Sequence, residues 1–262
     1  MKLNQKTALL TGASGGIGQA LARDLSAKGA RLILIGREQQ RLEALRNTLP
    51  EKADIIVADL LSAADRITIA ETVTRSNRPV DILINNAGVS DFRLFESCND
   101  TEIEQMMQLN LIAPMQLTRS LLPALNQNAS QIVNIGSTFG SIGYPGFTCY
   151  CASKYGLRGF SEALSRELAD TNTIVQHIAP RATKTSINSS AVVSLNERLG
   201  NHMDTPQWVS AKIVQAIEKE KKSLNLGWPE KLFVTINATF SSIVERHIAT
   251  QLPAIKSFAQ EN

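Results

Sequence analysis

The sequence predicts an α/β fold in which a doubly wound parallel sheet is covered by helices on both faces. Short apolar runs alternate strictly with segments of helical periodicity from residue 7 to residue 179. A glycine-rich turn, Thr11–Gly18, joins the first apolar run to the first helical segment. Such alternation implies parallel strands that are joined by right-handed crossovers. The chain of 262 residues shows no internal repeat or interdomain linker, so one domain is expected.

The predicted elements follow from these two periodicities. Each strand is a short apolar run of the kind that is buried in a parallel sheet. Strands are predicted at Thr7–Gly12, Ala30–Arg37, Asp54–Leu60, Val80–Gly88, Gln131–Ser137 and Thr173–Ala179, with a short one near Leu224–Leu226. Helices are predicted between them at Gly16–Lys28, Glu38–Leu49, Ala63–Ser76, Thr101–Gln127, Tyr150–Ala169 and Pro206–Lys221. Gly29 and Pro50 end the first two helices, and Pro114 is expected to bend the fourth.

Two segments depart from this alternation. Residues 181–205 are polar and contain no clear strand, so a lid or a disordered segment is expected there. Residues 229–262 form a C-terminal helical extension beyond a dinucleotide-binding catalytic domain, 1–228. An apolar stripe at helical spacing is predicted in this extension at Leu232, Phe233, Ile236, Phe240, Ile243 and Val244. The stripe is expected to cover the protein's own substrate-side surface or a subunit interface. A membrane interface is disfavoured because the polar face has few lysines and arginines.

Composition excludes several classes of protein. The net charge of +3 comes from 27 basic and 24 acidic residues, which is too balanced to indicate nucleic-acid binding. No apolar run approaches the ~20 residues of a membrane span, and the first strand begins too early to leave room for a signal peptide. We therefore expect a soluble cytoplasmic protein. Neither the cysteines nor the histidines have metal-ligand spacing, so no metal is expected. These residues are Cys98, Cys149, Cys151, His177, His202 and His247.

The glycine-rich turn has the sequence context of a phosphate-binding site. Gly12, Gly16 and Gly18 stand between a predicted strand and a predicted helix, where glycines permit a tight turn and a close backbone approach. The helix N-terminus then offers free N–H groups to a pyrophosphate. A simple tight turn is the alternative. Arg37 ends the second strand, where NAD sites carry an acidic residue, so NADP(H) is favoured although Glu38 follows.

A second group of residues points to acid–base chemistry. Tyr150 and Lys154 lie four residues apart, on one face of a predicted helix. A neighbouring ammonium favours the phenolate, so we expect Lys154 to lower the pKa of Tyr150. Ser137 is a candidate hydrogen-bond donor to a substrate oxygen. Tyr-x-x-x-Lys pairs also occur by chance as surface contacts, so the motif gains weight from its order after the glycine-rich turn.

Together these motifs resemble the short-chain dehydrogenase/reductase family over about residues 5–227. Thr11–Gly18 matches the glycine-rich turn of the family, and Asn85–Gly88 matches its NNAG motif. Asp59 and Leu60 match the pair that contacts the adenine. Four residues match the catalytic tetrad of the family: Asn110, Ser137, Tyr150 and Lys154.

The resemblance implies a Rossmann-type fold and reduction of a carbonyl, with the substrate unknown and with acyl-linked and lipophilic carbonyls both open. It implies that Tyr150 supplies the proton, Ser137 polarises the carbonyl, Lys154 binds the nicotinamide ribose and Asn110 holds a relay water. The cofactor-binding residues it implies are Gly12, Ser14, Gly16, Ile17, Gly18, Arg37, Asp59, Leu60, Asn86, Ala87, Gly88, Tyr150, Lys154, Pro180 and Thr185.

One departure and several alternatives remain. The family commonly has glycine after the proline of the sixth strand, whereas this chain has Pro180-Arg181. Arg181 is expected either to meet an anionic group of the cofactor or substrate or to lie in solvent. A homo-oligomer, dimer or tetramer, is expected because most soluble oligomers are symmetric assemblies of one chain. A sensor or scaffold that binds nucleotide without turnover is the alternative function, although it would not need Tyr150 with Lys154.

Overall fold

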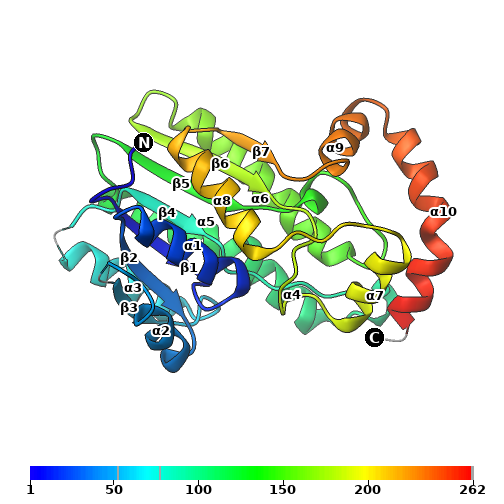
Figure 1. The fold of residues 1–262 in the computed structure, drawn as a ribbon, viewed down its shortest axis with the longest axis horizontal. Helices are drawn as coiled ribbons and strands as arrows, with labels where there is room; N and C mark the ends of the chain where they lie inside the picture. The colour runs from blue at the N-terminus through cyan, green and yellow to red at the C-terminus, as the bar shows by residue number, and fades with distance from the viewer. Residues whose placement is uncertain (52, 77, 261–262) are drawn as a thin grey trace.

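The computed structural model describes residues 1–51, 53–76 and 78–260 and has the predicted doubly wound architecture. Figure 1 shows a central sheet with helices on both faces. In the described part of the chain the sheet has seven parallel strands in the order β3-β2-β1-β4-β5-β6-β7. The strands are β1 Thr7–Thr11, β2 Arg31–Gly36, β3 Ala53–Val57, β4 Ile82–Asn85, β5 Ser130–Ile135, β6 Thr173–Ala179 and β7 Ser223–Asn225. The strand order reverses between β1 and β4, which is where doubly wound sheets bind ligands.

The helices bury apolar residues against the two faces of this sheet. On one face, Leu21 and Leu25 of α1 and Ile213 of α8 pack against β1 and β2. On the other face, α3, α5 and α6 cover a separate cluster that includes Ile69 and Leu117. The helices are α1 Gly16–Ala27, α2 Gln39–Arg46, α3 Ala63–Arg75, α4 Asp100–Met107, α5 Ala113–Leu121, α6 Thr148–Glu167, α7 Ser190–Arg198, α8 Pro206–Glu218, α9 Glu230–Thr239 and α10 Ser241–Gln260.

The long helical stretch predicted over Thr101–Gln127 is present from Asp100 to Ala124, but it is not one regular α-helix. A π-helical turn, Gln108–Ile112, separates α4 from α5. Pro114 lies in the first turn of α5, where a proline is tolerated in a helix. The side chain of Asn110 turns inward within this wider turn and is 1 % exposed. It accepts a hydrogen bond from the Val89 N–H at 2.9 Å and donates to the Val89 carbonyl at 2.9 Å. The regular α-helix is therefore interrupted at the π turn, a feature that is frequent at functional sites, rather than at Pro114.

The prediction for residues 181–205 was partly wrong, because this segment contains α7. The side chain of Ser189 caps the helix by accepting a hydrogen bond from the Val192 N–H. Val192 and Leu195 are buried, three residues apart on one face of the helix. These two residues are the apolar signal for a helix in an otherwise polar segment.

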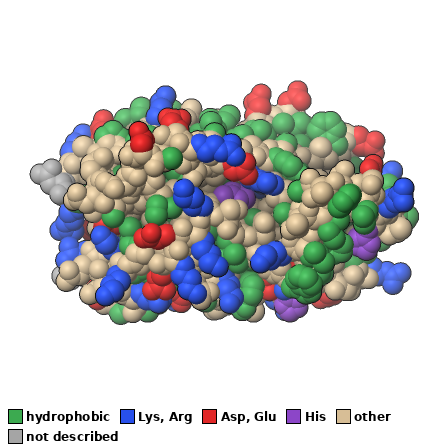
Figure 2. Space-filling view, turned by 90° about the horizontal axis from the view of Figure 1, so that it is seen from above, with side chains coloured by type: hydrophobic (Ala, Val, Ile, Leu, Met, Phe, Trp, Pro, Cys, Tyr) green, Lys and Arg blue, Asp and Glu red, His purple; other side chains and the backbone are tan. Residues whose placement is uncertain are grey.

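The C-terminal extension consists of two helices, so its apolar stripe does not run on one face as predicted. The helical conformation is interrupted at Phe240, between α9 and α10. Val234 and Val244 face inward with Ile142, whereas Leu232, Phe240 and Ile243 are exposed. Figure 1 shows α10 lying along one end of the molecule, and Figure 2 shows hydrophobic side chains gathered over that end. Among the described helices, none combines the length and the apolar content that a membrane crossing needs.

Candidate active site

A cavity of about 350 Å³ opens at the carboxyl ends of β1, β2 and β3, where the strand order reverses. Most of the predicted cofactor-binding residues lie in its wall. The predicted residues that line it are Gly12, Ser14, Gly16, Ile17, Gly18, Arg37, Asp59, Leu60, Asn86, Ala87, Gly88 and Thr185. Three other residues predicted for the cofactor, Tyr150, Lys154 and Pro180, line a neighbouring cavity. The structure thus gathers twelve of these residues, from five separate segments of chain, around one hollow.

The glycine-rich turn is closely packed against the loop that follows β4. Gly12 has a φ of +62°, and a Cβ there would lie 2.8 Å from the Cα of Ala87. The hydroxyl of Thr11 accepts hydrogen bonds from the Asn86 and Ala87 N–H groups, at 3.0 and 3.1 Å. A Cβ on Gly16 would lie 2.5 Å from Cγ2 of Thr185, so the loop after β6 crosses over the turn. These contacts leave room for backbone but not for side chains, as a phosphate-binding turn requires.

Two guanidinium groups stand at the end of this cavity beyond β2. Arg37 is exposed and lines it, as the sequence predicted. Arg41, which sequence reasoning missed, lines it as well. Arg41 forms an ion pair of 2.8 Å with Glu38 and donates to the carbonyl oxygen of Ser14 at 2.9 Å. The three-residue helical spacing of Glu38 and Arg41 was the available signal. Glu38 is thus partnered by a cation within the protein.

Tyr150 and Lys154 both lie on the first turns of α6, as predicted. The ammonium of Lys154 is 5.7 Å from the centre of the Tyr150 ring and donates to the Ile135 carbonyl oxygen at 3.0 Å. Burial lowers the pKa of Lys154 to about 8. Burial also raises the pKa of Tyr150 to about 12, although a hydrogen bond with Ser137 opposes this. The prediction of a lowered pKa for Tyr150 is therefore wrong, because burial dominates and the Lys154 charge is not among the causes of the shift. At neutral pH the phenol carries its proton.

Asn110 is held behind these residues rather than in the wall of the cavity. Its amide donates to the Ser153 hydroxyl of α6 at 3.1 Å. A Cβ on Gly88 would lie 3.0 Å from Oδ1 of Asn110 and 3.7 Å from the Lys154 ammonium nitrogen. Asn110, Gly88 and Lys154 are therefore neighbours.

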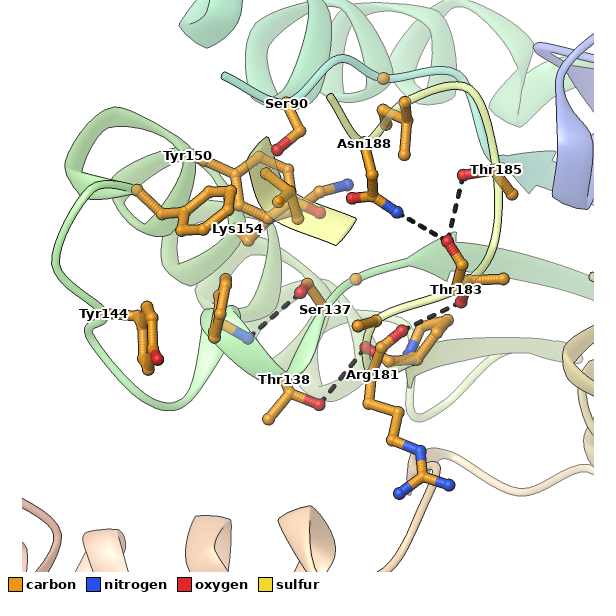
Figure 3. A pocket seen from close by; sticks show the side chains of 18 of the residues that line it. Ser90, Ser137, Thr138, Tyr144, Tyr150, Lys154, Arg181, Thr183, Thr185 and Asn188 are labelled. Atoms are coloured by element: carbon orange, nitrogen blue, oxygen red, sulfur yellow. Dashed lines mark hydrogen bonds between the residues drawn. The ribbon is translucent and has the colours of Figure 1, made fainter. Parts of the chain in front are cut away.

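Ser137, Tyr150 and Lys154 line a second cavity of about 180 Å³. Figure 3 shows their side chains with the loop after β6, in which the Thr183 carbonyl oxygen accepts hydrogen bonds from Asn188 and Thr185. The two cavities meet, since six described residues line both: Ile17, Asn86, Gly88, Val89, Thr185 and Ile187. A ligand that extends along the first cavity can therefore present its end to Ser137 and Tyr150.

The far wall of this second cavity is aromatic. Phe139, Tyr144 and Phe147 line it together with Tyr150, and ring centres in this group lie 4.9 to 6.5 Å apart. Ile255 and Ala259 of α10 are buried in the same cluster, which also includes Val192 and Leu195 of α7. Sequence reasoning missed this wall. Only Tyr150 carried a recognisable spacing, and the other rings come from a segment without helical or strand periodicity.

Arg181 does not lie in solvent, so that expectation was wrong. Contact with an anionic group of a ligand stays a prediction, because Arg181 lines the second cavity although its guanidinium is paired within the protein. Its side chain is 9 % exposed and donates to both carboxylate oxygens of Asp204, at 2.9 and 3.0 Å. It also donates to the Glu230 carboxylate at 2.8 Å and to the Trp228 carbonyl oxygen at 2.7 Å. Arg181 thereby joins the loop after β6 to the first turn of α9.

Several known proteins have sequences similar to that of this chain. The model of the family described as short chain dehydrogenase matches residues 6–195. Nodulation protein G of Rhizobium sp. (strain N33) is 39 % identical over 180 residues, which cover 68 % of this chain and 74 % of that protein. The 3-oxoacyl-[acyl-carrier-protein] reductase FabG of Haemophilus influenzae is 36 % identical over 176 residues, which cover 67 % of this chain and 73 % of the relative.

Solved structures resemble the chain over nearly its whole length. A short-chain dehydrogenase from Streptomyces avermitilis superposes with a TM-score of 0.80 at 28 % identity and covers 97 % of this chain and 98 % of its own. A short-chain dehydrogenase from Sphingobium yanoikuyae, solved in complex with NADPH, superposes with a TM-score of 0.77 at 26 % identity. That likeness covers 92 % of this chain and 95 % of the other.

Proposed function

The chain belongs to the short chain dehydrogenase family of oxidoreductases, and we propose that it reduces a ketone or an aldehyde to an alcohol with NADPH. The observation that carries the proposal is the meeting of the two cavities. One has the walls of a dinucleotide site, and the other contains a protonated phenol beside a serine hydroxyl and an ammonium. Redox chemistry at a carbon–oxygen bond needs both parts in contact.

The residues around the first cavity fit a dinucleotide. The positive end of the α1 dipole and the glycine-lined turn suit a pyrophosphate, because no side chain intervenes between the ligand and the backbone N–H groups. Arg37 and Arg41 suit a 2′-phosphate, which is why we propose NADPH rather than NADH. The NADPH complex of the Sphingobium yanoikuyae relative supports this choice. When bound, the cofactor supplies the hydride.

The protein's own groups handle the proton. Because the pKa of Tyr150 is about 12, its hydroxyl is protonated at neutral pH and can donate to the oxygen of a carbonyl as that oxygen gains negative charge. The Ser137 hydroxyl, which hydrogen-bonds Tyr150, is positioned to donate to the same oxygen. Lys154 keeps most of its charge at neutral pH, since its pKa is about 8. We assign Lys154 to holding the cofactor ribose and Asn110 to positioning Lys154 through Val89, Gly88 and Ser153.

A paired assay tests this function. NADPH oxidation is followed with a panel of lipophilic ketones, aldehydes and acyl thioesters; the last are included because one relative is a 3-oxoacyl-[acyl-carrier-protein] reductase. The expected result is turnover of at least one class by the wild type, and NADPH binding without turnover by Tyr150→Phe. Tight NADPH binding with no turnover of any carbonyl by the wild type would replace the reductase by a nucleotide-binding sensor.

A further inference from the structure

The aromatic wall of the active-site cavity separates it from a second hollow. A groove of about 510 Å³ lies between α10 and the segment that precedes α6. Pro145, Cys151, Val244 and Ile248 give it an apolar lining. Among the residues that the structure describes, Tyr144 alone lines both this groove and the active-site cavity. Tyr144 is therefore the described residue that borders both spaces.

Tyr144 is held in this position from two sides. Its ring stacks on Phe139, with centres 4.9 Å apart and planes inclined by 14°. Its hydroxyl lies 3.2 Å from Oε1 of Gln251 on α10 and donates to it. Burial raises the pKa of Tyr144 to about 12, so the phenol stays a neutral donor at physiological pH. Figure 3 shows Tyr144 at the edge of the pocket, apart from Tyr150.

The shape of the cavity beside Tyr150 and Ser137 sets the direction of a substrate. The cavity that contains these two hydroxyls is also lined by the apolar rings of Phe139 and Phe147, against which the rest of a bound carbonyl compound can pack. An apolar tail that packs against these rings leaves water, which stabilises the complex. On the groove side, Glu245 adds a negative charge, which disfavours an anionic tail end.

We propose that Tyr144 is the specificity-determining residue that ends the substrate pocket, and that the substrate is a carbonyl compound with a neutral apolar tail whose length Tyr144 limits. This proposal rests on the proposed reductase function for the position of the carbonyl. It assigns to α10 a part in substrate selection, because Gln251 keeps the Tyr144 ring across the passage to the groove.

Binding of a homologous series tests the proposal without turnover. The probes are alkan-2-ones from hexan-2-one to tetradecan-2-one, and their Kd values are measured by calorimetry in the presence of NADP⁺. For the wild type, Kd should fall about fourfold with each added methylene until the tail reaches Tyr144, and then stay constant. Tyr144→Ala should move this plateau to ketones that are several carbons longer, because the tail then enters the groove.

Two variants serve as matched controls. Phe147→Ala also removes a ring from the pocket wall, but Phe147 does not border the groove, so weaker binding at all lengths and an unmoved plateau are expected. Tyr144→Phe removes the hydrogen bond to Gln251 but keeps the ring that stacks on Phe139, so the plateau should move less than in Tyr144→Ala. If Tyr144→Ala does not fold, as judged by its melting curve, Tyr144→Val opens the same passage.

The outcomes separate the two hypotheses. A plateau at the wild-type length in both opening variants, an equal shift in Phe147→Ala, or no binding of any alkan-2-one would overturn the role of Tyr144. Length-dependent binding that shifts as expected, but without NADPH oxidation by any variant or the wild type, would support the pocket limit and refute the reductase.

Discussion

Replacing Arg181 by Met tests how strongly the C-terminal extension is fixed to the body of the protein. The substitution keeps the volume of the side-chain stem and removes the guanidinium that contacts Asp204, Glu230 and the Trp228 carbonyl oxygen. Asp204 is 5 % exposed, so its carboxylate would stay buried without its main partner. Removing one member of a buried ion pair typically costs ~3–5 kcal/mol.

The lower end of that range is expected here. His202 lies 3.5 Å from the Asp204 carboxylate and can offer a partial replacement charge when protonated. Glu230 is partly exposed and can regain water. A loss of about 3 kcal/mol would lower the melting temperature by roughly 6–12 °C for a protein of this size. Urea unfolding would measure the free energy, and scanning calorimetry would measure the temperature.

A double variant and a surface control show whether the lost stability comes from leaving a buried charge unpaired. Arg181→Met with Asp204→Leu removes both charges, and most of the lost stability should return, since apolar pairs often replace buried ion pairs at little cost. Arg75→Ala breaks an exposed pair with Glu71 and should change stability by less than ~1 kcal/mol. A loss below about 1 kcal/mol in Arg181→Met, or no recovery in the double variant, would refute the reasoning from burial.

Three further predictions concern the candidate site and its surroundings. Tyr150→Phe should keep NADPH binding nearly intact and lower kcat by ~10²–10⁴-fold, because only the proton donor is removed; a variant with more than half the wild-type kcat would contradict the role. Arg37→Ala should raise the KM for NADPH, because about 1.5–3 kcal/mol of phosphate binding is lost, and should leave the KM for NADH unchanged. Equal efficiencies with both cofactors in the wild type would contradict the phosphate site. Burial lowers the pKa of His177 to about 4. The unfolded chain therefore takes up a proton between pH 6.5 and 4 that the folded protein does not, so stability is full above pH 6.5 and is lost as the pH falls through this window. The loss should reach about 2 kcal/mol at pH 5, and His177→Gln should flatten the profile in urea unfolding.

The parts of the fold that could be predicted are those with a short-range pattern. Short apolar runs predict the strands of the parallel sheet, and the spacing of the glycines from Gly12 to Gly18 predicts the turn. The spacing of Tyr150 and Lys154 places both on one helix face before any tertiary contact is known. Each of these features is decided within about one turn of helix or one strand, so the sequence and the structure agree on them.

The features that escaped prediction depend on contacts between distant segments. Asp204 and Glu230 lie 23 and 49 residues from Arg181, and nothing near position 181 reveals them. Gln251 lies 107 residues from Tyr144, so the wall of the pocket cannot be inferred from its neighbours in sequence. The raised pKa of Tyr150 follows the same rule, because desolvation depends on the whole surrounding structure whereas the pairing with Lys154 is local.

The exchange of glycine for arginine at position 181 has a counterpart elsewhere in the chain. Gly227 has a φ of +93°, and a Cβ there would lie 2.5 Å from Cδ of Arg181. Glycine is therefore required at position 227 both by the backbone conformation and by the arginine side chain that crosses it. The loop after β6 is further held where the Lys184 N–H donates to the Asp204 carbonyl oxygen at 2.8 Å and the Asp204 N–H donates to the Ala182 carbonyl oxygen at 2.9 Å. A glycine after Pro180 would give freedom to this loop, whereas arginine with Asp204 and Glu230 removes it. In this chain Arg181 therefore links the loop after β6 to the first turn of α9.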